Sequence, residues 1–158
     1  MLLRGVLSSP LERLARRCSR IWPDRTALER CLTEGLDALP SCKYIYALDA
    51  RAHQITANVS TRGLLPEHFG RDRSQRPYLA EALSGEPFSL SDAYISRNAR
   101  RPSLTAVRHI ESNDGSLLGY LGADFDLREL PPTREVYQQP DQWVQMKGDP
   151  ALRGGLFY

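Results

Sequence analysis

The first third of the chain carries a helical pattern of apolar residues. Its apolar positions recur at spacings of three and four residues, which places them on one face of a helix: Leu11, Leu14, Cys18 and Ile21. Ser9-Pro10-Leu11-Glu12 has the form of a capping box with proline at the first helical position. We therefore expect an amphipathic helix that begins at Ser9 and ends before Pro23.

A second helix is predicted to follow at once. Asp24 is a suitable N-cap, and Pro40 ends the pattern. The apolar stripe of this helix consists of Ala27, Leu28, Cys31, Leu32 and Leu36. Residues 1–40 are thus predicted to form an N-terminal helical segment that packs on a sheet.

Beyond Pro40 the pattern changes to short strands. Strand-like runs of β-branched and aromatic residues cover 43–48, 54–59, 88–90, 93–96, 104–111 and 117–127. The first two runs form a predicted hairpin, and Asn113-Asp114-Gly115 joins the last two in another. A long polar connection over 60–76, of a length that is usually functional or mobile, leads into a short helix over 77–83 that Gly85 closes. The sheet is therefore predicted to be antiparallel.

Composition and charge narrow the functional classes. With 158 residues, 41% apolar and 25% charged, the chain suits one folded domain and does not suit disordered or fibrous classes. A net charge of +2 does not indicate nucleic acid as a partner, and no apolar run reaches the roughly 18 residues of a membrane span. Up to Cys31 the balance is +4, which leaves −2 on the remainder. Such a basic helix could lie on a membrane or bind a partner, but packing in the core with a solvated basic face is favoured.

The cysteines and histidines do not indicate a metal or catalytic centre. Cys18, Cys31 and Cys42 are odd in number and have no Cys-x-x-Cys spacing, so we interpret them as reduced thiols, with Cys18 and Cys31 acting as small apolar residues. The histidines are scattered without metal-ligand spacing: His53, His68 and His109. No nucleophile or phosphate-binding motif is present. We expect no cofactor, no metal and no enzymatic activity.

Asp124 is the first candidate for binding chemistry. It lies in the middle of an apolar strand, where alternation places it on one face with Leu118, Tyr120 and Gly122. A carboxylate in such a position needs a cation or several donors. A ligand ammonium, an internal arginine or a solvated strand face would each meet that need.

Arg76-Pro77-Tyr78 is the second candidate, at the point where the long connection enters the short helix. Arginine offers a planar fork for a carboxylate, and tyrosine offers an apolar wall with a polar tip. Tyr94 and Ser96 share a face of a short strand and could add hydroxyl groups, although tyrosine in strands also serves packing.

Three segments in this order resemble the Cache (PDC, extracellular PAS-like) sensor family: 72–82 (DRSQRPYLAEA), 88–96 (FSLSDAYIS) and 119–127 (GYLGADFDL). The resemblance implies an α+β fold with a PAS-like central antiparallel sheet of about five strands. A long N-terminal helix would cover one face, and a loop-and-helix cap would cover a ligand pocket. It divides the chain into the helical segment, a sensor core over 41–132 and a C-terminal extension over 133–158. The apolar end of the extension, Leu156-Phe157-Tyr158, has two interpretations, a truncated longer chain or an ordinary terminus.

The resemblance also implies roles for individual residues. Arg76 would hold a ligand carboxylate, Tyr78 and Tyr94 would form aromatic walls, and Asp124 would accept a ligand amine or hydroxyl. Leu79 stands where the amino-acid-binding members carry a second aromatic residue, so the ligand class stays open among amino acids, amines and small organic acids.

These observations lead to a predicted small-molecule sensor in signal transduction. Its partners would be the ligand, a second copy bound through the N-terminal helix and a downstream signalling protein, without nucleic acid or membrane insertion. Family members usually lie outside the cell between membrane helices, and because this sequence shows none, a cytoplasmic location is expected. The alternative is a dimerisation or regulatory module of the same fold that needs no ligand.

Overall fold

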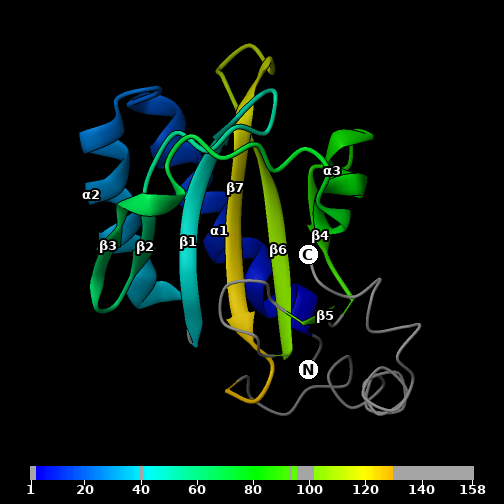
Figure 1. Cartoon of the computed structure of the whole chain (residues 1–158). Helices are drawn as coiled ribbons and strands as arrows, with labels where there is room; N and C mark the ends of the chain where they lie inside the picture. The colour runs from blue at the N-terminus through cyan, green and yellow to red at the C-terminus, as the bar shows by residue number, and fades with distance from the viewer. Residues whose placement is uncertain (1–2, 40, 93, 96–101, 130–158) are drawn as a thin grey trace.

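The computed structural model describes residues 3–39, 41–92, 94–95 and 102–129 (Figure 1). The helices are α1 (Leu3–Arg20), α2 (Arg25–Gly35) and α3 (Ala80–Leu83), with 3₁₀ turns η1 (Leu36–Ala38), η2 (Pro66–His68) and η3 (Pro77–Leu79). The strands are β1 (Cys42–Asp49), β2 (Asn58–Ser60), β3 (Gly63–Leu65), β4 (Phe88–Leu90), β5 (Tyr94–Ile95), β6 (Pro102–Glu111) and β7 (Leu117–Asp126). The predicted site residue Ser96 and the predicted extension over 133–158 lie outside the described residues.

The strands form one antiparallel sheet in the order β3-β2-β1-β7-β6-β4, with β5 also paired to β6. The three long strands β1, β7 and β6 stand in the middle, and the short strands flank them (Figure 1). This confirms the predicted α+β fold. The sheet has more strands than the expected five or so, but the extra ones are short. Strand β3 pairs only with β2, and β5 has two residues.

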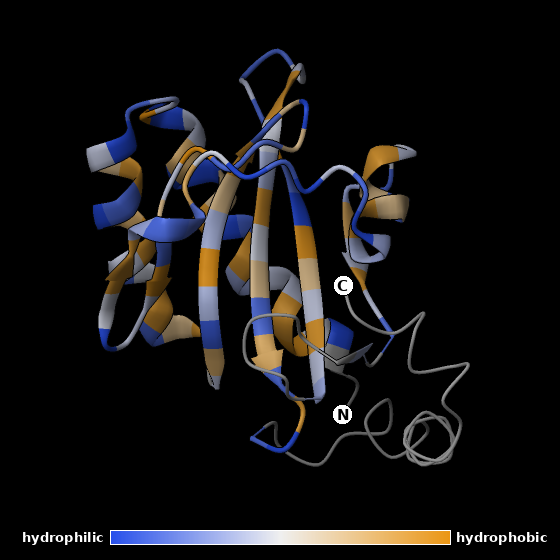
Figure 2. Cartoon of the chain, in the orientation of Figure 1, coloured by the Kyte–Doolittle hydropathy of each residue, from blue (hydrophilic) through white to orange (hydrophobic). Residues whose placement is uncertain are grey.

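One face of the sheet packs against α1 and α2, which lie behind it in Figure 1. Leu7, Leu11 and Leu14 of α1 are buried in one core cluster with alternate residues of β6 and β7, such as Ala106 and Leu121. Figure 2 shows the matching alternation of apolar and polar bands along the central strands. Burying this face supplies the apolar contact that an amphipathic helix requires.

The start of α1 differs from the prediction. The helix begins at Leu3, and Pro10 lies inside it. The Ser9 hydroxyl accepts a hydrogen bond from the Arg13 side chain at 3.4 Å within the helix. Burial of Leu7 extends the apolar stripe by one turn, and the predicted boundary at Ser9 is therefore wrong. The cap of α2 is confirmed, because Asp24 Oδ1 accepts from the Ala27 N–H at 3.1 Å.

The two predicted hairpins are present in different forms. The turn between β6 and β7 places Gly115 at φ +86°, a conformation that favours glycine. In the first hairpin, Ile45 pairs with Val59. The segment over 50–57 is mostly an irregular connection, which shortens the expected strand over 54–59 to Asn58–Ser60.

The other face of the sheet lies under η3 and α3 and carries a second cluster. Its buried members are Tyr46, Leu48, Ala52, Tyr78, Leu79, Ala82, Tyr94, Val107 and Tyr120. Leu118, expected on this face, packs instead against the cluster under α1, because the β6–β7 register shifts between Ile110 and Glu111. Among the described residues, no helix is long and apolar enough to cross a membrane.

Removing the side chain at the centre of α1 tests this arrangement. Leu11→Ala should lower the free energy of unfolding by about 2–4 kcal/mol, because it leaves a cavity at a fully buried position. Arg13→Ala, at an exposed position of the same helix, should change it by less than about 0.5 kcal/mol. Equilibrium unfolding in urea measures both, and equal effects would contradict the packing of α1 on the sheet.

Candidate functional site

A buried arginine stands at the centre of the second face. Arg73 is 4% exposed, and it follows η2 in the long connection. Its Nε donates to Gln54 Oε1 at 2.8 Å, its Nη1 to the Tyr78 hydroxyl at 2.9 Å and its Nη2 to Asn58 Oδ1 at 3.2 Å. These bonds use three of the five guanidinium N–H groups. One N–H on each terminal nitrogen is left for a further acceptor.

The segment over 66–76 is held by backbone hydrogen bonds to the irregular connection after β1. The Arg73 N–H donates to Ala52 O at 2.9 Å, the Gln54 N–H to Arg71 O at 2.8 Å and the Gly70 N–H to Gln54 O at 2.8 Å. The connection is anchored in turn to α2, where Glu29 accepts from the Ala57 N–H at 2.7 Å. The position of Arg73 is thus determined by segments that are distant in sequence.

A half-buried carboxylate lies on the same face. Thr105 Oγ1 of β6 and the Tyr46 hydroxyl of β1 each donate to Asp124 Oδ1 at 2.9 Å. The Tyr94 hydroxyl bonds to Thr105 Oγ1 and continues the chain of hydroxyl groups. Both described hydrogen bonds to Asp124 end on Oδ1, and the residue is only half-buried. Toward the described residues, Oδ2 therefore remains an acceptor for a further donor.

Tyr46 links the arginine and the carboxylate. The Arg73 guanidinium lies 4.0 Å from the centroid of the Tyr46 ring, while the hydroxyl of that ring reaches Asp124. The ring crosses Gly122, where a Cβ would lie 2.3 Å from Tyr46 Cε2. Glycine at 122 therefore leaves the space in which Tyr46 bridges the two charges.

The surroundings of Asp124 disfavour its ionised form. Burial raises the pKa of Asp124, against the opposing effects of Arg73 and of the hydrogen bonds from Thr105 and Tyr46. Burial, together with Asp124, also raises the pKa values of Tyr46 and Tyr94, so both phenols remain donors at neutral pH. A ligand cation or hydroxyl beside Asp124 would relieve the cost of its burial.

Aromatic and hydroxyl groups complete the site. Tyr78 and Tyr94 stack with ring centroids 5.7 Å apart. Beside Tyr78, a cavity of about 180 Å³ lies between the η3–α3 cap and β4. Ser89 of β4 is 2% exposed and lines this cavity, and its Oγ has no hydrogen-bond partner within the described part of the chain. An unpaired buried hydroxyl is costly in a folded protein. The cavity therefore offers a polar contact that a ligand or water would fill.

The fold is similar to solved ligand-binding domains. The ligand-binding domain of the Pseudomonas fluorescens chemoreceptor CtaA, in complex with L-serine, is 21% identical, with a TM-score of 0.57 over 78% of this chain and 50% of that one. The ligand-binding domain of the Campylobacter jejuni chemoreceptor Tlp3, in complex with 4-methylisoleucine, is 14% identical, with a TM-score of 0.62 over 79% and 50%. This chain has the Cache fold.

The Cache fold also extends to a protein of a different kind. The Bacillus subtilis YkuI protein, which has an EAL domain, is 21% identical, with a TM-score of 0.60 over 84% of this chain and 32% of that one. The chain thus spans half or less of the length of these three structures. No protein family defined by sequence matches it, and no curated protein matches it.

Three of the residues that the Cache resemblance singled out lie together. Tyr78, Tyr94 and Asp124 share the face under the cap. Arg76, the expected carboxylate anchor, is half-buried at the start of η3, and its charge lowers the pKa of Tyr78. It therefore lies near the aromatic wall, and its role as the anchor stays a prediction.

Sequence reasoning missed the more deeply buried arginine and its partners. Arg73 precedes Arg76 by three residues in a polar stretch, and nothing in the local pattern distinguishes the two. Tyr46 could have been found from strand alternation, since Tyr44, Tyr46 and Leu48 share one face of β1. Gln54 and Asn58 were detectable as polar residues inside a strand-like run, where burial demands a hydrogen-bonding partner.

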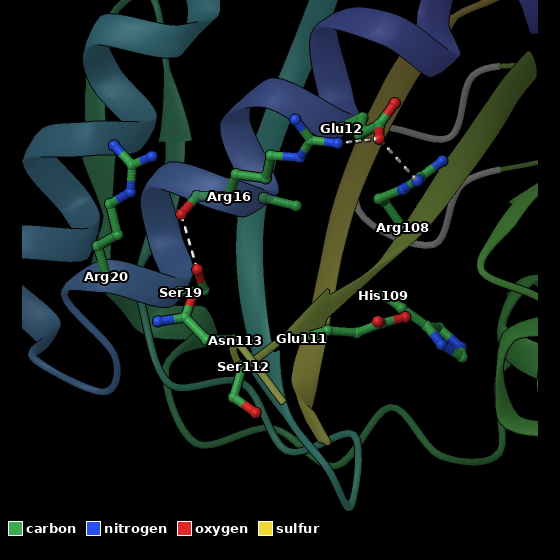
Figure 3. Close-up of a pocket in the computed structure, with 10 residues that line it drawn as sticks. Glu12, Arg16, Ser19, Arg20, Arg108, His109, Glu111, Ser112 and Asn113 are labelled. Atoms are coloured by element: carbon green, nitrogen blue, oxygen red, sulfur yellow. Dashed lines mark hydrogen bonds and ion pairs between the residues drawn. The ribbon is translucent and has the colours of Figure 1, made fainter. Parts of the chain in front are cut away.

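Another cavity, of about 320 Å³, lies on the helical side between α1 and the β6–β7 turn (Figure 3). Glu12 bridges Arg16 at 2.8 Å and Arg108 at 3.8 Å there (Figure 3), and Arg20 also contributes to the lining. Its charges largely neutralise one another, and the side chains of Arg16 and Glu12 are 71% and 40% exposed. The buried face beneath η3 is therefore the stronger candidate.

Among the described residues, no group of three or more His, Cys, Asp or Glu is placed to hold a metal ion.

Adding a methyl group at Gly122 tests the bridge made by Tyr46. Gly122→Ala should destabilise the fold by about 1–3 kcal/mol, because the new Cβ overlaps a ring that is fully buried. Gly5→Ala is the matched control, since a Cβ there meets nothing within 4 Å. Thermal unfolding compares the two variants, and an unchanged Gly122→Ala protein would contradict the described position of Tyr46.

Neutralising Asp124 tests the cost of its burial. The pKa of Asp124 is higher in the folded protein than in the unfolded chain, where it is about 4. The free energy of unfolding of the ligand-free protein should therefore fall as the pH rises from about 4 through the folded-state pKa, because the folded state ionises less readily. Asp124→Asn should therefore raise the free energy of unfolding at pH 7 by roughly 0.5–1 kcal/mol. The gain should disappear near pH 3, where the wild-type carboxyl is also neutral. A variant that is less stable than wild type at pH 7 would show that the carboxylate stabilises the apo fold.

Proposed function

We propose that this chain is a sensor domain that binds a small molecule carrying both a carboxylate and an amine or hydroxyl group. The observation that carries the proposal is the pair of opposite charges on one face of the sheet: Arg73 lies over the ring of Tyr46, and Asp124 accepts a hydrogen bond from the hydroxyl of the same residue. Each charge retains unused hydrogen-bonding capacity. A zwitterion placed between them would satisfy both.

The geometry assigns a part to each group. A ligand carboxylate would accept from the free N–H groups of Arg73, a bidentate arrangement that arginine favours. A ligand ammonium or hydroxyl would donate to Asp124 Oδ2. The stacked rings of Tyr78 and Tyr94 would contact the apolar part of the ligand. The complexes of CtaA with L-serine and Tlp3 with 4-methylisoleucine support amino acids as the first class to test.

We propose no catalytic role for this site. Here the tyrosine hydroxyls and Thr105 serve as donors in one chain to Asp124, and His109 bonds to Ala82 O at 2.8 Å. A bound ligand would signal by shifting the balance between two conformations of the domain, for which it has different affinities.

The alternative of a ligand-independent dimerisation module has less support. The apolar stripe of α1 is buried in the core of the same chain, so a homodimer through this helix would use its polar face. That homodimer, a downstream signalling partner and a cytoplasmic location all stay predictions.

Calorimetric titration with L-serine, L-alanine and a panel of amines and small organic acids tests the proposal. At least one compound that carries a carboxylate should bind. Arg73→Lys should weaken its binding by roughly tenfold or more, because lysine cannot reproduce the planar fork. Asp124→Asn should weaken binding of the same compound if it carries an amine.

Two further variants sharpen the result. Arg62→Lys, at an exposed position outside the site, should leave the affinity unchanged. Arg76→Lys decides whether the predicted anchor also contacts the ligand. If no compound binds, or if binding is insensitive to both Arg73→Lys and Asp124→Asn, the proposed site is refuted. A stable dimer that forms without ligand would then favour the alternative.

A further inference from the structure

Two cysteine thiols meet where α1 packs on α2, on the opposite side of the sheet from the proposed ligand site. Cys18 of α1 and Cys31 of α2 are both buried in the core cluster. Cys18 lies one helical turn after Leu14, Cys31 lies one turn before Gly35, and the ion pair of Arg17 with Glu34 joins the helices between these positions, which places the two thiols at the same level of the helix contact. The helices approach closely here, since a Cβ at Gly35 would lie 2.7 Å from Leu14 Cδ1. The sequence alone indicated two separate apolar positions, whereas the fold makes them neighbours.

One of these thiols is open to a small reagent. Cys31 lines a cavity of about 300 Å³ together with Arg17, Arg20, Arg30 and Glu34. Arg17 forms an ion pair with Glu34 at 2.5 Å and is close enough to both thiols to interact with their charges. A positively charged opening of this kind favours a thiolate over a thiol.

The surroundings divide the cysteines into three different roles. A hydrogen bond from Cys18 lowers the pKa of Cys31, and Arg17 lowers it further, against the effect of burial. The bond with Cys31 and burial raise the pKa of Cys18. Cys42 lies apart, with its thiol bonded to Tyr44 O at 3.3 Å, and burial raises its pKa. The chain therefore holds one thiol on the arginine-lined cavity, one neighbouring buried thiol and one buried thiol that lies apart from both.

We propose that Cys31 and Cys18 form a peroxide-sensitive dithiol that oxidises to a disulfide linking α1 to α2. The Cys31 thiolate attacks hydrogen peroxide, so that an S–O bond forms, the O–O bond breaks and the departing hydroxide takes up a proton to give water. The Cys18 sulfur then attacks the Cys31 sulfur, an S–S bond forms, and the sulfenic oxygen leaves with the Cys18 proton as a second water. The dithiol loses two electrons, and the peroxide gains them.

Mass spectrometry of the folded full chain tests this assignment. The protein is treated with hydrogen peroxide at neutral pH, then denatured and alkylated with iodoacetamide. Two of the three thiols should be lost in a monomeric product, and a reductant should restore them. In Cys42→Ser, trypsin should yield one cross-linked pair of peptides that contain Cys18 and Cys31. Loss of Cys42, a disulfide between two chains or retention of all three thiols would overturn the proposal.

Single variants resolve the order of the steps. In Cys18→Ser, peroxide should leave a sulfenic acid on Cys31 that a cyclic 1,3-dione traps. In Cys31→Ser, thiol loss should slow by roughly tenfold or more, because the activated thiolate is absent. If Cys31→Ser reacts as fast as wild type, Cys31 is not the attacking thiol and the proposal is wrong. The wild-type measurement stands even if one variant fails to fold.

Discussion

The buried guanidinium of Arg73 is the group around which the second face of the sheet is arranged. A cation removed from water is stable only when hydrogen-bond acceptors replace its hydration. Gln54, Asn58 and the Tyr78 hydroxyl each accept one of its N–H groups, and the ring of Tyr46 covers its plane. One side chain therefore contacts the cap, the connection after β1, and strands β1 and β2.

The two faces of the sheet differ in what they bury, and therefore in how they affect stability. The face under α1 and α2 is apolar, and burial of leucine and other aliphatic side chains stabilises it. The face under η3 and α3 holds a cation, a carboxylate and four tyrosines in close quarters. The first face provides stability, and this offsets the cost of burying charged and polar groups on the second face.

The hydrogen-bond chain through Tyr94, Thr105 and Asp124 shows how the second face remains ordered despite that cost. Each hydroxyl has a defined acceptor, so the carboxylate has a fixed orientation. In the proposed site, this orientation would reduce the ordering cost of binding. The unpaired Oγ of Ser89, in the adjoining cavity, indicates that polar capacity on this face exceeds what the described residues use among themselves.

Local pattern in the sequence predicted much of the fold. Helical spacing located α1 and α2, strand alternation placed Asp124 on the face of Tyr120 and Gly122, and the Asp-Gly pair located the β6–β7 turn. These features depend on neighbours a few residues apart, and backbone geometry imposes their periods directly. The start of α1 was predicted wrongly for the same reason, because the burial of Leu7 against the sheet is not a local property.

Pairs of residues far apart in sequence were decided by the tertiary structure. Arg73 and Arg76 look alike in the sequence, and only the hydrogen bonds to Gln54 and Asn58, from another segment, bury the first more deeply than the second. Cys18 and Cys31 look like ordinary core positions in the sequence, and only the packing of α1 on α2 makes them neighbours. The sequence by itself determined which residues could be buried and on which face of an element they lie. The tertiary structure decided which of them touch, because contacts between distant segments depend on how whole elements pack.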